Sequence, residues 1–352
     1  MNNLISIIEA YAAAYPKMQP SDAVKLVYQA TFGGGHMVSG HRDVISCLKS
    51  EYVSINHEDK PPVCESLGDT SRPYLDCTLS DDELELVAKI FSASARHFSK
   101  DFAESDKEQR DIFNARLQLL SELCAKGVFS FSPTELAVYL EKYRSSGCPA
   151  VSHSQVYRDS YKPAYRVIDS RYVRLLPTVF EILRLIRDNR WVVLAIDGRA
   201  ASGKTTAAAL ISELFSAQTI HMDHFFLPGE LRTNERLSEV GGNIHRERFI
   251  QEILPSLRCD DGFSYRVFDC SRFDYNDSPR RILPAPLYIV EGSYAFHPMF
   301  GKYYDVSFFS DVSYEEQLER ILRRNGERML ERFKNEWIPM EERYFDSIGK
   351  GR

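Results

Sequence analysis

The chain lacks any run of apolar residues long enough to cross a membrane. A membrane-spanning helix needs about 18 such residues in a row, whereas the longest runs here, such as residues 192–196, have the length of a β-strand. The first residues also lack the basic start and cleavable apolar stretch of a signal peptide. These absences predict a soluble, cytoplasmic protein without a membrane partner.

The sequence also lacks paired cysteines and an excess of basic residues. Its seven cysteines form no Cys-x-x-Cys pair and no Cys/His group with the spacing of a zinc site. Such usage is typical of reduced thiols inside a cell. The 44 Lys and Arg residues are outnumbered by 50 Asp and Glu residues, for a net charge of −6. Without a basic excess we expect no nucleic-acid partner, although a local basic pocket could still bind a small anion.

The first half of the chain has the apolar spacing of helices. Up to about residue 187, apolar residues recur every three or four positions. Ser80 with Glu83, and Ser132 with Glu135, form capping boxes that each predict the start of a helix. The Pro- and Gly-containing stretch from 56 to 79 is irregular. We therefore expect a mainly α-helical domain over residues 1–187.

The pattern changes at Trp191 to a continuous apolar run, residues 191–196, which is typical of a strand buried on both faces. Similar runs at 219–222, 287–290 and 306–309 alternate with helical stretches. Alternating strands and helices predict an α/β domain over residues 188–352, built on a mainly parallel sheet with flanking helices.

A G-x-x-x-x-G-K-[ST] motif lies between the first of these strands and an Ala-rich helix, as a P-loop requires. Its glycines let backbone amides point at phosphate oxygens. Lys204 would reach the β- and γ-phosphates, and the Thr205 hydroxyl would ligate Mg²⁺. We therefore expect ATP and Mg²⁺ as cofactors. The predicted nucleotide-binding residues are Gly198, Arg199, Ala200, Ala201, Ser202, Gly203, Lys204, Thr205 and Thr206.

Two carboxylates follow the next two predicted strands. Asp223 comes after the second strand and Glu291 after the third. Because the carboxyl ends of parallel strands meet at one edge of a sheet, both should face the P-loop. Asp223 could accept a proton from an acceptor hydroxyl or hold the metal, and Glu291 could ligate Mg²⁺ directly or through water. A purely structural role in a cap or turn is the alternative for each.

Taken together, residues 196–206, Asp223 with the aromatic residues after it, and residues 290–292 resemble the uridine kinase, phosphoribulokinase and pantothenate kinase group of P-loop kinases. The resemblance covers about the second half of the chain, and the P-loop is its most specific part. It implies that Asp223 is the base for a substrate hydroxyl. It also implies an Arg-rich lid, which residues 320–328 resemble.

The lid candidates are four arginines, among which Arg324 is our choice for the catalytic one: Arg320, Arg323, Arg324 and Arg328. Guanidinium groups there could neutralise charge that develops on a transferring phosphoryl group. The same segment also has the charge pattern of a solvated amphipathic helix, because glutamates lie four residues from several arginines.

Residues 241–249 and 265–269 lie where uridine-kinase-like proteins place acceptor-binding loops. The resemblance therefore makes Tyr265, Arg266, His245 and Arg246 candidates for substrate binding. Tyr265 could stack on a base, and an arginine could pair with a phosphate or carboxylate. A structural role is the alternative for each. No apolar run follows Phe345, so the last sheet strand of family members is expected to be shortened or replaced here.

Two features of the first half stay without an assigned role. Three glycines at 33–35 are followed by His36 and His41, and this segment could bind a ligand or simply form a turn between helices. A polar and aromatic cluster at 153–166 could line a groove or bridge the domains. Acceptor binding, regulation and oligomerisation all remain open for the helical domain.

The sequence thus favours an ATP-dependent kinase that phosphorylates a hydroxyl of a small molecule, with a nucleoside or sugar as the candidate acceptor. Lys204, Asp223 and Arg324 are its predicted catalytic residues, and Thr205 and Glu291 its metal ligands. The alternative is a regulatory switch in which ATP binding or hydrolysis controls the helical domain. Asp223 separates the two hypotheses, because a switch needs no base for an acceptor.

Overall fold

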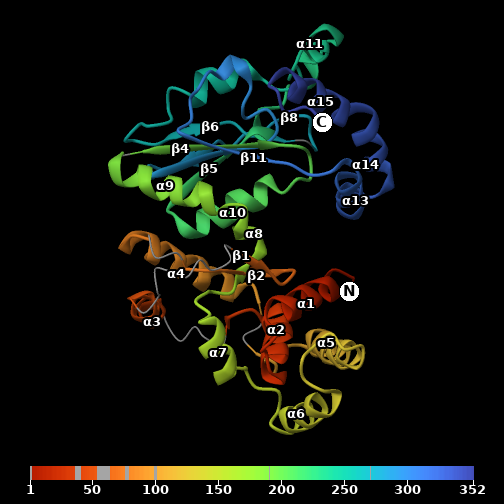
Figure 1. The fold of residues 1–352 in the computed structure, drawn as a ribbon. Helices are drawn as coiled ribbons and strands as arrows, with labels where there is room; N and C mark the ends of the chain where they lie inside the picture. The colour runs from red at the N-terminus through yellow and green to blue at the C-terminus, as the bar shows by residue number, and fades with distance from the viewer. Residues whose placement is uncertain are drawn as a thin grey trace. The chain divides into compact units, whose positions relative to one another are not determined.

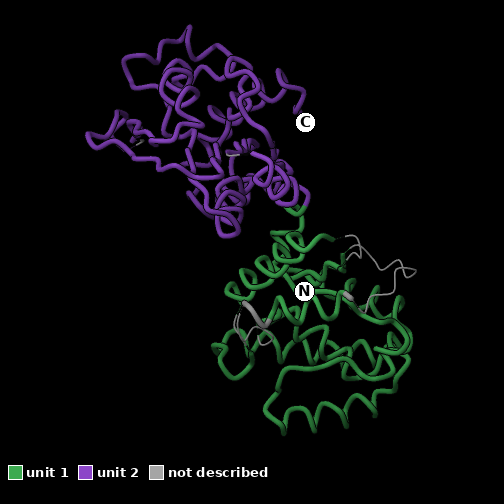
Figure 2. The backbone as a smooth tube through the Cα atoms, turned by 90° about the vertical axis from the view of Figure 1, so that its left-hand side faces the viewer, with its two compact units in different colours: residues 1–176 green, residues 177–352 purple. Residues whose placement is uncertain are grey.

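The computed structural model describes residues 2–35, 41–53, 64–75, 79–98, 101–189, 191–269 and 271–352. Residue 36 and the side chain of His41, singled out from the sequence, lie outside these described parts. The chain divides into two compact units, Met1–Leu176 and Pro177–Arg352 (Figure 2). The predicted boundary at residue 187 falls near the end of a helix, α9 (Leu176–Asp188), that lies almost wholly in the second unit.

The first unit consists mainly of helices beside one small antiparallel sheet of order β1-β2-β3 (Figure 1). Both predicted capping boxes are confirmed: Ser80 is the N-cap of α4, and Ser132 is the N-cap of α6. The elements are α1 (Asn2–Ala14), α2 (Pro20–Phe32), α3 (His41–Val53), β1 (Cys64–Ser66), β2 (Thr70–Pro73), α4 (Asp81–Arg96), α5 (Lys107–Ala125), α6 (Pro133–Ser145), α7 (Gln155–Tyr161), β3 (Ile168–Asp169) and α8 (Ser170–Val173).

Helix α2 forms the centre of the first unit, because every residue from 22 to 32 is buried. Its apolar side chains meet α5 and α6 in the core, where the rings of Tyr28 and Phe32 pack on Phe113. Its polar side chains are buried as well, and a buried polar group is costly unless it is hydrogen-bonded. The polar residues of α2 therefore need partners inside the unit.

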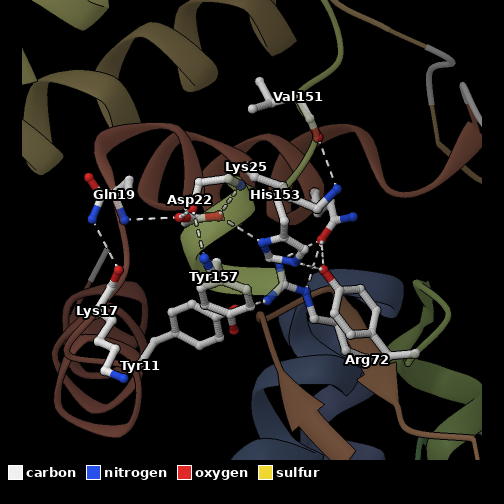
Figure 3. A network of polar contacts seen from close by, with 12 residues as sticks. Tyr11, Lys17, Gln19, Asp22, Lys25, Arg72, Val151, His153 and Tyr157 are labelled. Atoms are coloured by element: carbon white, nitrogen blue, oxygen red, sulfur yellow. Dashed lines mark hydrogen bonds and ion pairs between the residues drawn. The ribbon is translucent and has the colours of Figure 1, made fainter. Parts of the chain in front are cut away.

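Asp22 of α2 is the centre of one such set of hydrogen bonds (Figure 3). Its carboxylate accepts from the backbone of Gln19 (2.9 Å), from the ring of His153 (2.9 Å) and from the amide and hydroxyl of Ser154 (2.9 and 2.6 Å). The other ring nitrogen of His153 lies 2.6 Å from the Tyr165 hydroxyl. Burial lowers the pKa of His153 to about 4, so its ring is neutral near pH 7. The cluster predicted at 153–166 therefore contributes to the interior of the unit.

A second set of contacts surrounds Arg72 of β2, which is completely buried (Figure 3). Its guanidinium donates to the Gln29 side chain through Nε at 2.9 Å and to the Tyr11 hydroxyl at 2.7 Å. It also lies 4.6 Å from the centre of the Tyr165 ring. Lys25 is buried nearby, donates to the Val151 carbonyl at 2.9 Å, and has its pKa lowered to about 8 by burial. These contacts join α1, α2, β2 and the segment around α7.

The second unit is an α/β domain. Its elements are α9 (Leu176–Asp188), β4 (Val192–Gly198), α10 (Lys204–Leu214), β5 (Ala217–His221), η2 (Met222–Phe225), η3 (Gly229–Leu231), α11 (Asn234–Ser238), α12 (Arg246–Arg248), η4 (Phe249–Ile253), β6 (Phe263–Tyr265), β7 (Phe268–Asp269), β8 (Asp274–Tyr275), β9 (Arg280–Ile282), β10 (Leu287–Glu291), η5 (Pro298–Phe300), β11 (Val306–Ser310), α13 (Tyr314–Asn325), α14 (Glu327–Arg332), η6 (Phe333–Trp337) and α15 (Ile338–Ser347).

The main sheet has four parallel strands in the order β11-β4-β10-β5, which confirms the predicted parallel α/β domain. Strand β4 is buried along its whole length, as its continuous apolar run predicts. Helix α10 packs on three of the strands, and Figure 1 shows α9 on the same side of the sheet. Because all four strands are parallel, their carboxyl ends lie at the same edge of the sheet.

No strand follows β11 in the described residues 311–352; three helices and a π-helical turn follow instead. The end of the chain lies beside β11, because the Phe345 ring is 5.4 Å from the ring of Phe309 and the Lys350 ammonium is 5.5 Å from it. Residues of α15 and of the tail therefore pack against β11, where the last strand of family members was expected to be shortened or replaced. In the described part of the chain, no helix is long and apolar enough to cross a membrane.

The contacts of Asp22 give a first testable prediction. Replacing Asp22 with Ala would leave the His153 ring and the Ser154 donors buried without their acceptor. We expect Asp22→Ala to lower the free energy of unfolding by about 3 kcal/mol, measured by urea titration with circular dichroism. Asp111→Ala, at an exposed position of α5, is the matched control. A loss no larger than that of the control would show that the network does not stabilise the unit.

Candidate active site

The P-loop connects the end of β4 to the start of α10. Gly198 has a φ of +146°, and a Cβ atom at this position would lie only 1.9 Å from the carbonyl oxygen of Ser310 on β11. Gly203, with a φ of +97°, is the N-cap of α10. Because the first amides of a helix have no acceptor within the helix, those at the start of α10 are donors for an anion. The loop thus has the geometry of a phosphate-binding site.

The side chain of Lys204 folds back over the loop. Its Nζ donates to the carbonyl oxygens of Gly198 (2.7 Å) and Arg199 (2.9 Å) and lies 3.3 Å from the Ser293 hydroxyl. The ammonium group therefore sits directly at the predicted phosphate site. Arg199, which was also predicted in this loop, is buried with its guanidinium 4.9 Å from the centre of the Phe345 ring, so it stabilises the contact with the end of the chain.

Thr205 and Glu291 lie together, although they come from different elements. The Thr205 hydroxyl is 3.3 Å from each carboxylate oxygen of Glu291, because the parallel register places Glu291 at the end of β10, beside Ile196 of β4. The ring of His221, at the end of β5, hydrogen-bonds the same carboxylate. A hydroxyl and a carboxylate are hard oxygen ligands that suit Mg²⁺. His221 was not predicted from the sequence.

The described residues contain no group of three or more Asp, Glu, His or Cys side chains that could hold a metal by themselves. Mg²⁺ commonly keeps several waters and uses one or two protein oxygens together with substrate phosphates. The pair formed by Thr205 and Glu291 fits this mode of binding, and it does not fit a metal cage made only of protein ligands.

Asp223 lies in η2, just after β5, on the same edge of the sheet. Solvent reaches its side chain, yet the protein atoms around it raise the pKa of Asp223 above its usual value. Lys204 opposes this rise and Glu291 adds to it. Lys204 and Glu291 therefore act electrostatically on Asp223, and the role of Asp223 in the reaction stays a prediction.

The four candidate lid arginines lie on α13 and at the start of α14. Arg324 is close enough to Asp223 to lower the pKa of that carboxyl. Arg320 donates to the Ala201 carbonyl at 3.1 Å, so it contacts the P-loop backbone. Arg323, Arg324 and Arg328 are all exposed. Among the four, Arg320 is the one with a hydrogen bond to the loop, and Arg324 acts on Asp223 only through its charge.

Of the four candidate acceptor residues, Tyr265 contacts a residue next to Asp223. Its hydroxyl lies 2.9 Å from Nδ1 of His224, the residue after Asp223. The Tyr265 ring is buried and packs on Phe225 with the ring centres 5.3 Å apart. Burial lowers the pKa of His224 to about 4, so this ring is a neutral neighbour of Asp223.

The other three acceptor candidates are engaged in local contacts. His245 caps the short helix α12, where its ring accepts from the Arg248 amide at 3.4 Å. Arg246 is buried and pairs with Glu239. The guanidinium of Arg266 lies 4.9 Å from the centre of the Tyr275 ring. Each has a structural partner, and the structure does not gather them around Asp223.

Three further polar residues that the sequence did not single out complete the surroundings of the loop. Asp197 is buried and accepts hydrogen bonds from the Gly198 amide (2.6 Å), the Phe296 amide (2.8 Å) and the Tyr344 hydroxyl (2.6 Å). Burial raises the pKa of Asp197 to about 6. Ser293 and Glu341 contact the loop from β10's end and from α15. Of the three, Asp197 could have been predicted from the sequence, because it lies directly before the first glycine of the P-loop motif.

The fold and the loop define the second unit as an α/β P-loop domain. No protein family model and no curated protein matches the chain. Among solved structures it is similar to a protein provisionally described as a fructose transport system kinase from Silicibacter sp. TM1040, with 21% identity over 49% of this chain and 93% of that one and a TM-score of 0.41.

It is also similar to a protein provisionally described as a uridine kinase from Bacillus stearothermophilus, with 17% identity over 46% of this chain and 94% of that one and a TM-score of 0.33. Both descriptions name kinases. Since identity and TM-score are low, the activity has to be inferred from this chain's own residues.

The contact between Gly198 and Ser310 gives a second prediction. In Gly198→Ala the new methyl group would collide with a strand backbone, so we expect a loss of about 2 kcal/mol or more in the stability of the second unit. Tryptophan fluorescence during urea unfolding measures this loss, because Trp191 and Trp337 both lie in that unit. Gly229→Ala is the matched control, since no atom lies within 4 Å of a Cβ there. Equal stability of the two variants would contradict the prediction.

Proposed function

We propose that this protein is an ATP- and Mg²⁺-dependent kinase that transfers a phosphoryl group to a hydroxyl of a small molecule. The observation that carries the proposal is the meeting of three features at one edge of the sheet. These are the P-loop with Lys204, the oxygen pair of Thr205 and Glu291, and the solvent-reached carboxylate of Asp223. A switch that only binds or hydrolyses nucleotide would not need Asp223.

In the proposed reaction, the loop amides and Lys204 bind the triphosphate. Thr205 and Glu291 would hold Mg²⁺, which neutralises charge on the phosphate oxygens when bound. Asp223 accepts the proton of the acceptor hydroxyl while the oxygen of that hydroxyl forms a bond to the γ-phosphorus. The bond from that phosphorus to the bridging oxygen breaks, and ADP leaves. Arg324 offsets the negative charge of the transferring group.

The raised pKa of Asp223 suits this role, because a carboxylate with a higher pKa is a stronger proton acceptor. The neutral rings of η2 and β6 support an acceptor with several hydroxyl groups. His224, the residue after Asp223, lies within hydrogen-bond distance of the Tyr265 hydroxyl, and the neutral His224 ring adds no charge near η2. We therefore propose a nucleoside or a sugar as the acceptor, bound next to η2.

A screen of nucleosides and sugars for phosphorylation from ATP tests the proposal. We expect Asp223→Asn to lower kcat by about 100-fold or more while ATP still binds, and Lys204→Ala to lose activity as well. Asp277→Asn, at an exposed surface position, controls for the loss of one carboxylate. Tight ATP binding by the wild type with no acceptor phosphorylated would favour the regulatory switch. Full activity of Asp223→Asn would exclude this residue as the base.

The pair of Thr205 and Glu291 predicts a specific dependence on Mg²⁺. Glu291→Gln and Thr205→Val each remove a metal ligand, so we expect the Mg²⁺ concentration for half-maximal activity to rise about tenfold or more. Thr205→Ser keeps the hydroxyl and is the matched control. Titration of activity with Mg²⁺ at saturating ATP measures the change. If Thr205→Ser and Thr205→Val respond alike, the hydroxyl is not a metal ligand.

A further inference from the structure

Glu341 of α15 is a buried carboxylate that contacts the P-loop from 141 residues further along the chain. Its Oε2 atom accepts from the backbone amide of Ala200 at 3.0 Å. Its Oε1 atom lies 2.6 Å from the Ser293 hydroxyl, which in turn lies 3.2 Å from the carbonyl oxygen of Gly198. Both oxygens of Glu341 are therefore bound to the loop or to a residue that touches it.

The charge of Glu341 is balanced mainly by Lys204. Burial raises the pKa of Glu341, while Lys204 lowers it, and Asp223 adds to the rise. Tyr294, whose own pKa is raised well above its usual value by burial, also interacts electrostatically with Glu341. Lys204 forms no direct ion pair with Glu341 within 4 Å among the described contacts; Ser293 lies between them.

A nucleotide in the loop would disturb this balance. Its phosphate groups would recruit Lys204, the cation that offsets Glu341, and bring further negative charge to the same loop. A buried carboxylate in such a position favours its protonated form, because like charges nearby and low polarity both disfavour ionisation. Glu341 can take up a proton there and still receive the Ala200 amide on its carbonyl oxygen.

We propose that Glu341 is a positioning residue that sets the affinity of the P-loop for nucleotide phosphates: it holds the loop through Ala200 and Ser293, and it takes up a proton when phosphate binds. The inference rests on the proposed function, since it requires a nucleotide in the loop. By linkage, nucleotide affinity falls as the pH rises from the pKa of Glu341 in the free protein to its higher pKa in the complex, and levels off above that.

The variant Glu341→Gln removes the negative charge of the side chain and keeps its shape. Glu341→Gln can keep a hydrogen bond to Ala200 and one to Ser293, but it has no negative charge. We expect ADP to bind about tenfold more tightly to this variant than to the wild type, the size of one like-charge repulsion across such a loop. Asp346→Asn, an exposed position of the same helix, removes a carboxylate away from the loop and should leave ADP affinity unchanged.

Isothermal titration calorimetry with ADP in Pipes and in Tris buffer measures both affinity and proton uptake. Wild type and Asp346→Asn should take up more protons than the titration of ADP itself accounts for, and Glu341→Gln should not. Equal affinity and equal uptake in wild type and Glu341→Gln would overturn the role of Glu341 and leave the proposed function intact. Absence of ADP binding to the wild type would overturn both.

The wild-type measurement also decides the question if the glutamine variant does not fold. Wild-type uptake that equals the titration of ADP alone would overturn the proposal without any variant. A merely structural role of Glu341 would change thermal stability in the variant, but it would not change the number of protons bound with ADP.

Discussion

The second unit depends on one buried carboxylate, that of Asp197. It lies where β4 becomes the P-loop, and it accepts hydrogen bonds from the loop itself, from the segment after β10 and from α15. Three parts of the chain are thereby held at one point of the sheet edge. Since Ser293 and Glu341 belong to two of those parts, their contacts with the loop follow from the same arrangement.

A buried aspartate also organises the first unit, but its electrostatic situation is the opposite. Asp22 has a pKa below its usual value, because the hydrogen bonds from His153 and Ser154 outweigh burial. For Asp197, burial dominates, and the pKa rises to about 6. Both carboxylates join segments that are distant in sequence. Asp197 lies directly before the P-loop, so its hydrogen bonds fix the start of that loop.

The parts of the structure that depend on local sequence were predictable. The strand β4, the P-loop and α10 follow one another directly, and their apolar run, glycines and helix start are visible in the sequence. Asp223 and Glu291 could be placed because parallel strands end at a common edge. Their reactive roles remain predictions, whereas the 3.3 Å distance between the Thr205 hydroxyl and the Glu291 carboxylate is observed.

Contacts between distant segments could not be predicted from one sequence. Glu341 has no local pattern that distinguishes it from the other glutamates of the last helices, and its meeting with Ala200 depends on how α15 returns to the sheet. Arg72 lies in a stretch that appears irregular in sequence, yet the structure buries it completely in a short strand. Phe345 of α15 packs against Phe309 of β11, and no apolar run after it could have formed another strand.

The position of Lys204 has a consequence for the entropic cost of ligand binding. Its ammonium group already occupies the loop by bonding to the carbonyl oxygens of Gly198 and Arg199, so the free protein keeps the loop in shape with its own side chain. A phosphate group that arrives must exchange these internal bonds for new ones. The loop then needs little reorganisation, which lowers the entropic cost of binding, while departure of the ligand returns the lysine to a stable resting place.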